Sequence, residues 1–219
     1  MTVIVLLGAP GAGKGTQAPI LAERLGVPVL ASGNLLRAAV AERTALGREA
    51  DRFMSRGQLV PDATIVRVFL DRLEATDAVD GAILDGFPRT KVQAQALDDA
   101  HAEAGRRVDL AGYIEVPLEE LVERMASRRI CTANGHVYNL VSNPPATAGV
   151  CDIDGSELVQ RADDHEATVR ARMVEQVPSL LEVVDHYRDR GVLRSVDGRE
   201  PIAAVSEELL ATVHAMRTG

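Results

Sequence analysis

An apolar run followed at once by a glycine-rich turn constrains this chain more than any other feature. Residues 3–7 are continuously apolar, which is typical of a strand buried on both faces of a parallel sheet. Residues 8–17 then read Gly-Ala-Pro-Gly-Ala-Gly-Lys-Gly-Thr-Gln, and a helical pattern follows them. This order is the context of a phosphate-binding loop, in which backbone N–H groups and a helix N-terminus face phosphate oxygens. It disfavours the simpler interpretation, a turn that only joins a strand to a helix.

The turn matches the pattern G-x-x-x-x-G-K-[ST] with one change of register. Gly8, Gly13 and Lys14 occupy the expected places, but Gly15 follows the lysine and the hydroxyl comes one residue later, at Thr16. Lysine is rare here, because 22 of the 24 basic residues are arginine. We therefore expect Lys14 to carry the charge that binds phosphate. The displaced hydroxyl weighs against a direct contact between Thr16 and magnesium.

Composition and charge narrow the class of protein. The hydrophobic fraction of 46% and the charged fraction of 26% are ordinary for a globular chain of 219 residues, which we expect to form one large domain or one domain with insertions. The net charge of −8 argues against a nucleic-acid partner and against an anionic membrane surface. We expect no membrane span and no signal peptide. Two cysteines without an export signal favour the reducing cytoplasm.

Strand and helix patterns alternate along most of the chain. Predicted strands cover residues 3–7, 28–30, 82–84, 111–116 and 192–196. Predicted helices cover residues 14–25, 32–40 (with Ser32 as N-cap), 46–54, 63–73, 93–100, 118–128, 166–190 and 202–216. Such alternation predicts an α/β fold, with a central parallel sheet covered by helices.

The segment from about residue 127 to residue 164 breaks this alternation. It has no helical period, and it contains Pro144-Pro145 and both cysteines. A structureless loop of this length is uncommon inside a compact domain, so we expect a small inserted subdomain of short strands.

Further motifs follow the phosphate-binding loop along the chain. They are Ser32-Gly33-Asn34-Leu35-Leu36-Arg37, Leu84-Asp85-Gly86-Phe87-Pro88-Arg89-Thr90, the arginines Arg124, Arg128 and Arg129, and Gln160-Arg161-Ala162-Asp163-Asp164 followed by Arg170 and Arg172. In order and spacing, the whole set resembles adenylate kinase of the long-lid bacterial type, in the nucleoside monophosphate kinase family. The resemblance covers essentially the whole chain, and in that family the register of Gly15 and Thr16 is normal.

The resemblance implies a P-loop α/β fold of three layers around a central parallel sheet. A core would comprise residues 1–30, 61–126 and 165–219. A helical arm that binds the nucleoside monophosphate would comprise residues 31–60, and a small β lid residues 127–164. Both flaps are expected to close and exclude water, and the chain is expected to be a monomer.

The family reaction is reversible phosphoryl transfer from MgATP to AMP, which gives two ADP and serves adenine nucleotide homeostasis. It needs cations and positioning rather than a general base, because the acceptor is already an ionised phosphate. The alternatives are a catalytically silent ATP-binding module, a kinase for another nucleoside monophosphate and an ATPase. A pure ATP binder would have no use for arginines on the acceptor side.

The resemblance also assigns site residues. The predicted catalytic residues are Lys14, Arg89, Arg128, Arg161 and Arg172. The predicted ATP-binding residues are Gly11, Ala12, Gly13, Lys14, Gly15, Thr16, Arg124, Arg128, Val137, Tyr138 and Glu200. The predicted AMP-binding residues are Ser32, Arg37, Gln58, Leu59, Val60, Gly86, Phe87, Pro88, Arg89, Gln93, Arg161 and Arg172. Other arginines, among them Arg43, Arg48, Arg52 and Arg56, are expected to be surface charges.

Asp85 ends a predicted buried strand, where an acid without a partner is costly. Ligands of α/β sheets bind at this end of the strands, so we expect Asp85 and Thr16 to hold magnesium through water. A structural cap for a neighbouring loop is the alternative. The family usually has Asp where this chain has Asn34, which keeps the shape and loses the charge, so magnesium hydration or affinity is expected to be weaker.

Gln93 is the candidate for acceptor choice. It follows Arg89 at the family's spacing for the amide that reads the adenine edge of AMP. Ser32 replaces the usual Thr and keeps the hydroxyl. The alternative for Gln93 is an ordinary polar residue at the start of a helix.

One branch of the family ties its lid with zinc through Cys-x2-Cys and a later Cys-x2-Cys or Cys-x2-Asp. The corresponding positions here are Cys131, Asn134, Cys151 and Asp154, and Asn is a poor zinc ligand. Three arrangements stay open. The lid could be metal-free, with Asn134 hydrogen-bonded to Asp154 and the cysteines packed as apolar residues. It could hold zinc through Cys131, Cys151, Asp154 and water, or contain a disulfide, which a reducing compartment disfavours. His136 is expected to be a lid-surface residue.

Overall fold

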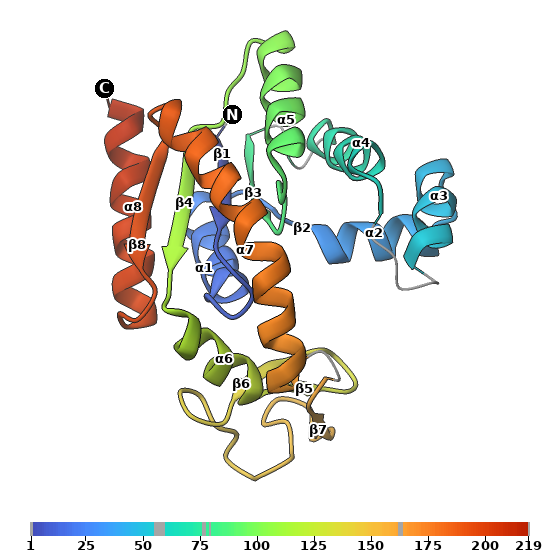
Figure 1. Ribbon diagram of the computed structural model, residues 1–219, viewed down its shortest axis with the longest axis vertical. Coiled ribbons are helices and arrows are strands. Elements are labelled where there is room, and N and C mark those ends of the chain that lie inside the picture. The colour runs from blue at the N-terminus through green and yellow to red at the C-terminus, as the bar shows by residue number, and fades with distance from the viewer. Residues whose placement is uncertain (1, 55–59, 76–77, 79, 162–163, 219) are drawn as a thin grey trace. The chain divides into compact units, whose positions relative to one another are not determined.

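The computed structural model describes residues 2–54, 60–75, 78, 80–161 and 164–218 (Figure 1). The chain divides into two compact units. The first, which we call the sheet unit, comprises Met1–Gly8, Gly13–Glu115 and Ser179–Gly219, and the second, the lid unit, comprises Ala9–Ala12 and Val116–Pro178. In the part of the chain described, no helix is both long and apolar enough to cross a membrane. The division into core, arm and lid stays a prediction.

The sheet unit is built on five parallel strands. They are β1 (Thr2–Leu7), β2 (Val29–Ala31), β3 (Gly81–Asp85), β4 (Leu110–Glu115) and β8 (Leu193–Asp197). Their order across the sheet is β2-β3-β1-β4-β8. In this register Asp85 pairs with both Leu6 and Ala31, which brings the carboxyl ends of β1, β2 and β3 to one edge. The predicted α/β fold with a central parallel sheet is confirmed.

The helices of the sheet unit follow the predicted segments closely. They are α1 (Lys14–Leu25), α2 (Ser32–Ala41), α3 (Ala45–Met54), α4 (Asp62–Leu73), α5 (Lys91–Glu103), α8 (Ile202–Thr218) and the C-terminal part of α7 (Glu166–Asp189). One detail of the prediction is wrong. Ser32 is the first residue of α2 rather than its N-cap, because Ala31 holds the extended conformation that precedes the helix.

Alternation along β1 buries side chains on both faces of the sheet. Val5 and Leu7 belong to one apolar cluster, together with side chains from α4, α5 and α7. On the other face, Leu6 and Leu209 of α8 both approach Gly112, where an added Cβ would lie 3.5 Å and 2.8 Å from their methyl carbons. Helices therefore cover both faces, which gives the expected three layers.

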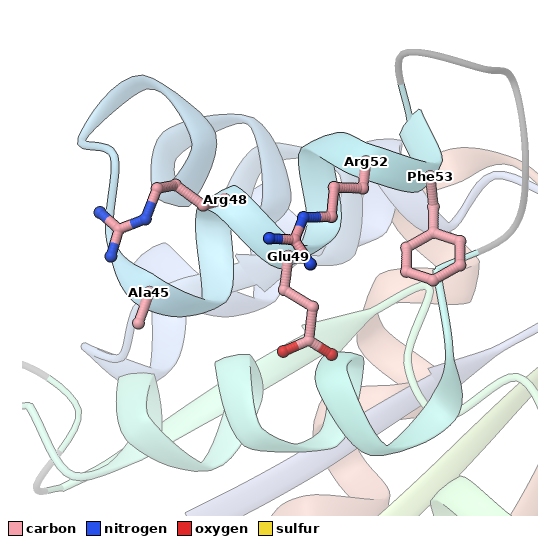
Figure 2. Close-up of a pocket in the computed structure, with 5 residues that line it drawn as sticks. All are labelled: Ala45, Arg48, Glu49, Arg52 and Phe53. Carbon is pink, nitrogen blue, oxygen red and sulfur yellow. The ribbon is translucent and has the colours of Figure 1, made fainter.

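A second apolar cluster joins α2, α3 and α4. Its buried members are Leu36, Ala50, Val60 and Val68. Across the same junction the Thr64 hydroxyl donates to the carboxylate of Glu49, which points toward α4 in Figure 2. A pocket of about 490 Å³ on α3 contains none of the predicted site residues; Ala45, Arg48, Glu49, Arg52 and Phe53 line it (Figure 2).

The lid unit contains a small antiparallel sheet. Its elements are α6 (Leu118–Ala126), β5 (Arg128–Cys131), β6 (Val137–Asn139), β7 (Leu158–Val159) and the N-terminal part of α7, with strand order β6-β5-β7. The short strands expected for the inserted segment are therefore present. The helix predicted to reach residue 128 ends at Ala126 instead, because Arg128 pairs with Asn139 of β6. The buried cluster of this sheet consists of Cys131, Tyr138, Cys151 and Leu158.

Candidate active site

The turn after β1 has the backbone of a phosphate-binding loop. Gly13 is the N-cap of α1 and has a φ of 103°, in the left-handed region that favours glycine. No side chain of the described residues caps this helix end, so its N–H groups and the positive end of its dipole are available to an anion. Lys14 Nζ donates to the Gly8 carbonyl oxygen at 2.6 Å, which holds the ammonium group at the loop. This geometry suits phosphate oxygens.

Asp85 lies beside the start of α1. Gly15 and Thr16 are exposed there, and an added Cβ at Gly15 would lie 3.8 Å from Asp85 Oδ2. The sheet register explains this proximity, since the strands that carry the loop and Asp85 are paired neighbours. Asp85 is therefore next to the phosphate-binding loop, as its predicted role with magnesium requires.

Two hydrogen bonds fix the guanidinium of Arg89 against the start of α2. Its Nε donates to the Gly86 carbonyl oxygen at 2.7 Å, and its Nη2 donates to Ser32 Oγ at 3.1 Å. Gly86 has a φ of 76°, and an added Cβ would lie only 2.7 Å from Ser32 Oγ. A larger residue would push this contact apart. Because Ser32 is buried and Arg89 is exposed, the arginine is held from the protein side and is accessible to a ligand.

The other predicted AMP-binding residues of the sheet unit lie on α2 and after β3. Arg37 is exposed, and its Nη2 donates to Asn34 Oδ1 at 2.6 Å, so Asn34 serves as a neutral acceptor for Arg37. Three further members are buried, namely Val60, Phe87 and Pro88. Gln58 and Leu59 lie outside the described residues.

The amide of Gln93 is buried and held at both ends. Its Nε2 donates to Asp62 Oδ1 at 2.7 Å, and its Oε1 accepts from the Arg89 backbone N–H at 2.7 Å. Thr90, the N-cap of α5, accepts from the Gln93 backbone N–H at 3.2 Å and donates to Asp62 Oδ2 at 3.0 Å. Gln93 is 2% exposed and lies in the first turn of α5, and its role in reading the base stays a prediction.

In the lid unit, a buried carboxylate positions Arg128. The Arg128 Nε donates to Asp164 Oδ2 at 2.8 Å, and its Nη2 donates to Asp164 Oδ1. The Asp164 side chain is 0% exposed, so the bidentate pair fixes one face of the guanidinium. The other predicted arginines of this unit are Arg124 on α6, Arg161 before α7 and Arg172 on α7.

The remaining predicted ATP-binding residues differ in exposure. Val137 of β6 is 60% exposed, whereas Tyr138 is buried and its hydroxyl accepts from the Asp152 N–H at 2.8 Å. The Tyr138 ring is therefore part of the lid core. Residues 11–12 belong to the lid unit, and Glu200 is exposed in the turn after β8 of the sheet unit.

Four side chains of the lid unit bring metal-binding atoms together. We call Cys131, His136, Cys151 and Asp154 the lid cluster; one N, S or O atom from each lies within 4.8 Å of all the others. His136 Nδ1 is 3.3 Å from Cys151 Sγ and 3.3 Å from Asp154 Oδ2. His136, expected to be a lid-surface residue, has a side chain that is 30% exposed and also contacts two members of this cluster. The chain turns at Gly135, with a φ of 71°, and brings His136 back beside Cys131.

Hydrogen bonds connect the lid cluster in this structure. Asn134 Nδ2 donates to Asp154 Oδ2 at 2.8 Å, the bond expected for a metal-free lid, and both cysteines are free thiols. That bond, helped by the Ser156 N–H, holds the pKa of the Asp154 carboxyl well below its usual range. Burial opposes ionisation of Cys151, but hydrogen bonds from Tyr138, the backbone and His136 outweigh it and lower the pKa of this thiol.

Comparison with known proteins gives a match across most of the chain. The family model described as adenylate kinase covers residues 6–192. The chain belongs to the adenylate kinase family. An adenylate kinase of Staphylococcus aureus (strain Mu50 / ATCC 700699) is 44% identical over 207 residues, which are 94% of this chain and 96% of that protein. Adenylate kinases of Exiguobacterium sibiricum and Clostridium botulinum (strain Loch Maree / Type A3) are also 44% identical, over 95% and 92% of this chain and 97% and 94% of their own lengths.

The lid cluster of this adenylate kinase family member has the donor set of a structural zinc site. Such sites are tetrahedral, with zinc–ligand distances of about 2.0–2.3 Å, which put the four donors roughly 3.3–3.8 Å apart. The atoms of the lid cluster, within 4.8 Å of one another, need only a small contraction. His136 supplies the nitrogen ligand that Asn134 cannot, so the cluster fits Zn²⁺ with two thiolates, one imidazole and one carboxylate.

Sequence reasoning missed the contacts of three residues, His136, Asp164 and Asp62. The spacing Cys131-x4-His136 was a signal, but the expected zinc pattern places the second ligand at residue 134. Asp164 belongs to a motif that pointed to the family, and its acidic character beside several arginines was a second signal. Asp62 had none, because its bond to Gln93 joins residues 31 positions apart.

Proposed function

We propose that this chain transfers the γ-phosphoryl group of MgATP to AMP, reversibly, with the products two ADP. The chain belongs to the adenylate kinase family, and the observation that carries the proposal is that its donor-side and acceptor-side groups lie at the same end of the sheet. There the phosphate-binding loop with Lys14 and the acceptor-side Arg89, held by Ser32, follow neighbouring strands. One site would bind a nucleoside triphosphate and the other a monophosphate, whose ionised phosphate is the nucleophile.

In this proposal the loop and the arginines do the chemistry by charge and position. Lys14 and the α1 N-terminus would bind the donor phosphates, while Arg37 and Arg89 would orient the acceptor phosphate. Arginine suits this task because its planar fork can hold two oxygens at once. No proton has to be removed from the acceptor, so the site needs no general base.

Lid-side arginines would complete the charge around the transferred group. Arg128 is the best supported of them, because its pair with buried Asp164 fixes the guanidinium on one side. Arg124, Arg161 and Arg172 are proposed to act with it when the lid closes and water is excluded. Exclusion of water would prevent hydrolysis of ATP.

Magnesium enters with ATP, as part of the substrate. We propose that Asp85 and Thr16 hold its water shell, since Asp85 lies beside the start of α1. Asp85→Asn would then raise the Mg²⁺ concentration needed for half-maximal rate, at saturating ATP and AMP. An unchanged Mg²⁺ requirement would assign Asp85 to a structural role instead.

The test of the function is ADP production from MgATP, without an acceptor and with AMP, GMP, CMP or UMP. We expect ADP with AMP and little without an acceptor. ADP without any acceptor would indicate an ATPase, and bound ATP with no ADP would indicate a silent binding module. Preference for another monophosphate would overturn AMP as the acceptor.

Two variants test the residue roles in the same assay. Lys14→Ala and Arg89→Ala are expected to lower turnover by about 10²–10³-fold, the cost of removing one preorganised charge, with an unchanged circular dichroism spectrum. Arg194→Ala is the matched control, because Arg194 is exposed on β8 and donates to its neighbour's carbonyl. Near-normal turnover of either site variant would reject its proposed role.

We also propose that the lid cluster holds a structural Zn²⁺ through Cys131, His136, Cys151 and Asp154. The support is the convergence of these four groups and their donor chemistry. His136→Ala should lose bound zinc, measured by metal analysis of the purified protein, while Asn134→Ala should keep it. Zinc-free protein after expression with added zinc would favour the metal-free lid.

We also propose that the protein is a monomer and acts in the cytoplasm. The two free thiols suit a reducing compartment, and an adenylate kinase site is complete within one chain. Size-exclusion chromatography with light scattering would show a mass near 23.4 kDa for a monomer. Twice that mass would reject it.

A further inference from the structure

We infer that Asp62 fixes the orientation of the Gln93 amide and so decides which purine edge the acceptor pocket accepts. The inference rests on the proposed role of Gln93 in binding the base of AMP. Asp62 itself is assigned no contact with substrate. It is a positioning residue at the start of α4, and Gln93 lies in the first turn of α5, the neighbouring helix in Figure 1.

The two partners of the Gln93 amide leave only one orientation. An ionised carboxylate can only accept, so the atom 2.7 Å from Asp62 Oδ1 must be the amide nitrogen. A backbone N–H can only donate, so the atom 2.7 Å from the Arg89 nitrogen must be the amide oxygen. A flipped amide would place oxygen against oxygen at one end and N–H against N–H at the other.

Thr90 aims the carboxylate of Asp62. Its hydroxyl donates to Asp62 Oδ2 at 3.0 Å, which turns Oδ1 toward Gln93. The same hydroxyl accepts from the Gln93 backbone N–H at 3.2 Å, so side chain and backbone of Gln93 are tied to one group. The network therefore sets the amide before any nucleotide binds.

Each end of the amide keeps one hydrogen-bonding position for a ligand. The nitrogen has a second N–H, and the oxygen has a second lone pair. Adenine offers an acceptor at N1 and a donor at its 6-amino group, which match this fixed N–H and oxygen. Hypoxanthine and guanine offer the reverse pattern, N1–H and O6. A site whose polar groups would be left unpaired discriminates strongly, so a fixed amide should select adenine.

Inosine monophosphate is the probe that isolates this effect. It has the size of AMP, without the 2-amino group of GMP, and it presents the reversed edge. The measured quantity is the ratio of kcat/KM for AMP to kcat/KM for inosine monophosphate, with MgATP as donor. Loss of stability alone lowers both values and leaves their ratio unchanged.

Asp62→Asn is the deciding variant. An asparagine at this position can accept from or donate to the Gln93 amide. The substitution therefore keeps the shape of the side chain but removes one of the two partners that fix the orientation of the amide. We expect the ratio to fall at least about tenfold, mainly through a gain with inosine monophosphate. Asp98→Asn is the matched control, since Asp98 lies on α5, the helix of Gln93, but pairs with His186 and Arg190. It should leave the ratio unchanged.

Variants at Thr90 and Gln93 keep the test decisive if Asp62→Asn folds poorly. Thr90→Val removes the bond that aims the carboxylate and should lower the ratio, while Thr90→Ser keeps that bond and should restore it. Gln93→Leu tests the underlying role. If it lowers the ratio while Asp62→Asn and Thr90→Val do not, Asp62 has no orienting role. If Gln93→Leu leaves the ratio unchanged, Gln93 does not read the base, and the inference fails with that assignment while the kinase activity stands.

Discussion

The two sheets of this molecule are stabilised in different ways. The parallel sheet is packed on a continuous apolar cluster, with members from its strands and from α4, α5 and α7. The lid sheet covers a buried cluster of four residues, of which two are the cysteines. Large apolar side chains of the lid instead face solvent, as Val141 at 68% and Ile153 at 71% exposure show.

The two sheets therefore obtain their stability from different sources. Apolar burial contributes about 25 cal/mol per Å², so a four-residue cluster supplies little against the entropy of ordering the lid. Buried side chains outside this cluster, such as Ile130 of β5 and Met125 of α6, add to it, and polar and metal-binding groups contribute as well. A lid of this kind can be ordered or loosened locally, while the sheet that positions the phosphate-binding loop stays intact.

The largest effect is expected in the apolar cluster of the sheet unit. Leu97→Ala, at a position with 0% exposure, should lower the free energy of unfolding by about 3 kcal/mol, because it removes packed atoms and leaves a cavity. Urea unfolding followed by circular dichroism measures it. Val92→Ala on the same helix, at a side chain 66% exposed, is the control and should change stability little. Equal losses of stability in the two variants would contradict the proposal that the buried cluster stabilises the sheet unit.

In the lid, breaking the pair of Arg128 and Asp164 should be the next largest effect. Asp164→Asn leaves the guanidinium without its carboxylate and should weaken the lid by about 2 kcal/mol, since Arg128 is partly exposed and water replaces some of the loss. Limited proteolysis should then cut the lid faster, with the main urea transition unchanged. Asp152→Asn, at an exposed lid acid, is the control. A shifted main transition would contradict local stabilisation.

Helices and strands could be predicted from the sequence where the residues of one segment define both of its ends. The bounds of α1 agree with the prediction residue for residue, because the glycine-rich turn and the helical period define both ends. Strand order could not be predicted, since β1 pairs with β3 and β4, which lie far along the chain. Ser32 looked like an N-cap locally, but its hydroxyl is used by Arg89, 57 residues away.

The candidate site divides in the same way. The motifs that contain the loop, Asp85 and Arg89 could be recognised because each directly follows a predicted strand, and their roles came from the family resemblance. The contacts of His136 and Asp62 could not be recognised, because their partners meet only when separate turns or helices pack. Motifs within one segment could therefore be predicted from the sequence, whereas contacts that orient one side chain by another from a distant segment could not.

A stabilising change is expected inside the apolar cluster. The Tyr187 hydroxyl is buried and has no hydrogen-bond partner among the described residues, and burial raises its pKa far above the usual range. Tyr187→Phe removes an unsatisfied polar group and should raise the free energy of unfolding by about 1 kcal/mol. Urea unfolding tests this gain. A loss of stability would indicate a hydrogen bond to the hydroxyl.

The smallest effect concerns pH. Burial lowers the pKa of His101 below the ordinary 6.5, opposed by Asp98 and aided by Arg106, and Nε2 has no partner among the described residues. At pH values between the folded and the unfolded pKa of His101, the unfolded chain binds more protons than the folded protein. Stability therefore rises with pH in this range, and this contribution is lost as the pH falls below about 6.5. His101→Leu should reduce that slope in urea unfolding between about pH 5.5 and 7.5. An unchanged slope would show that His101 does not titrate in this range.

Hydrogen exchange with and without a zinc chelator tests the contrast between the two sheets most directly. Amides of β5, β6 and β7 should lose protection when zinc is removed, by about 100-fold or more if zinc stabilises the lid by the free energy of binding. Amides of β1, β3 and β4 should exchange as before. Equal loss of protection in both sheets, or none in the lid, would contradict a lid held together by its cluster of Cys131, His136, Cys151 and Asp154.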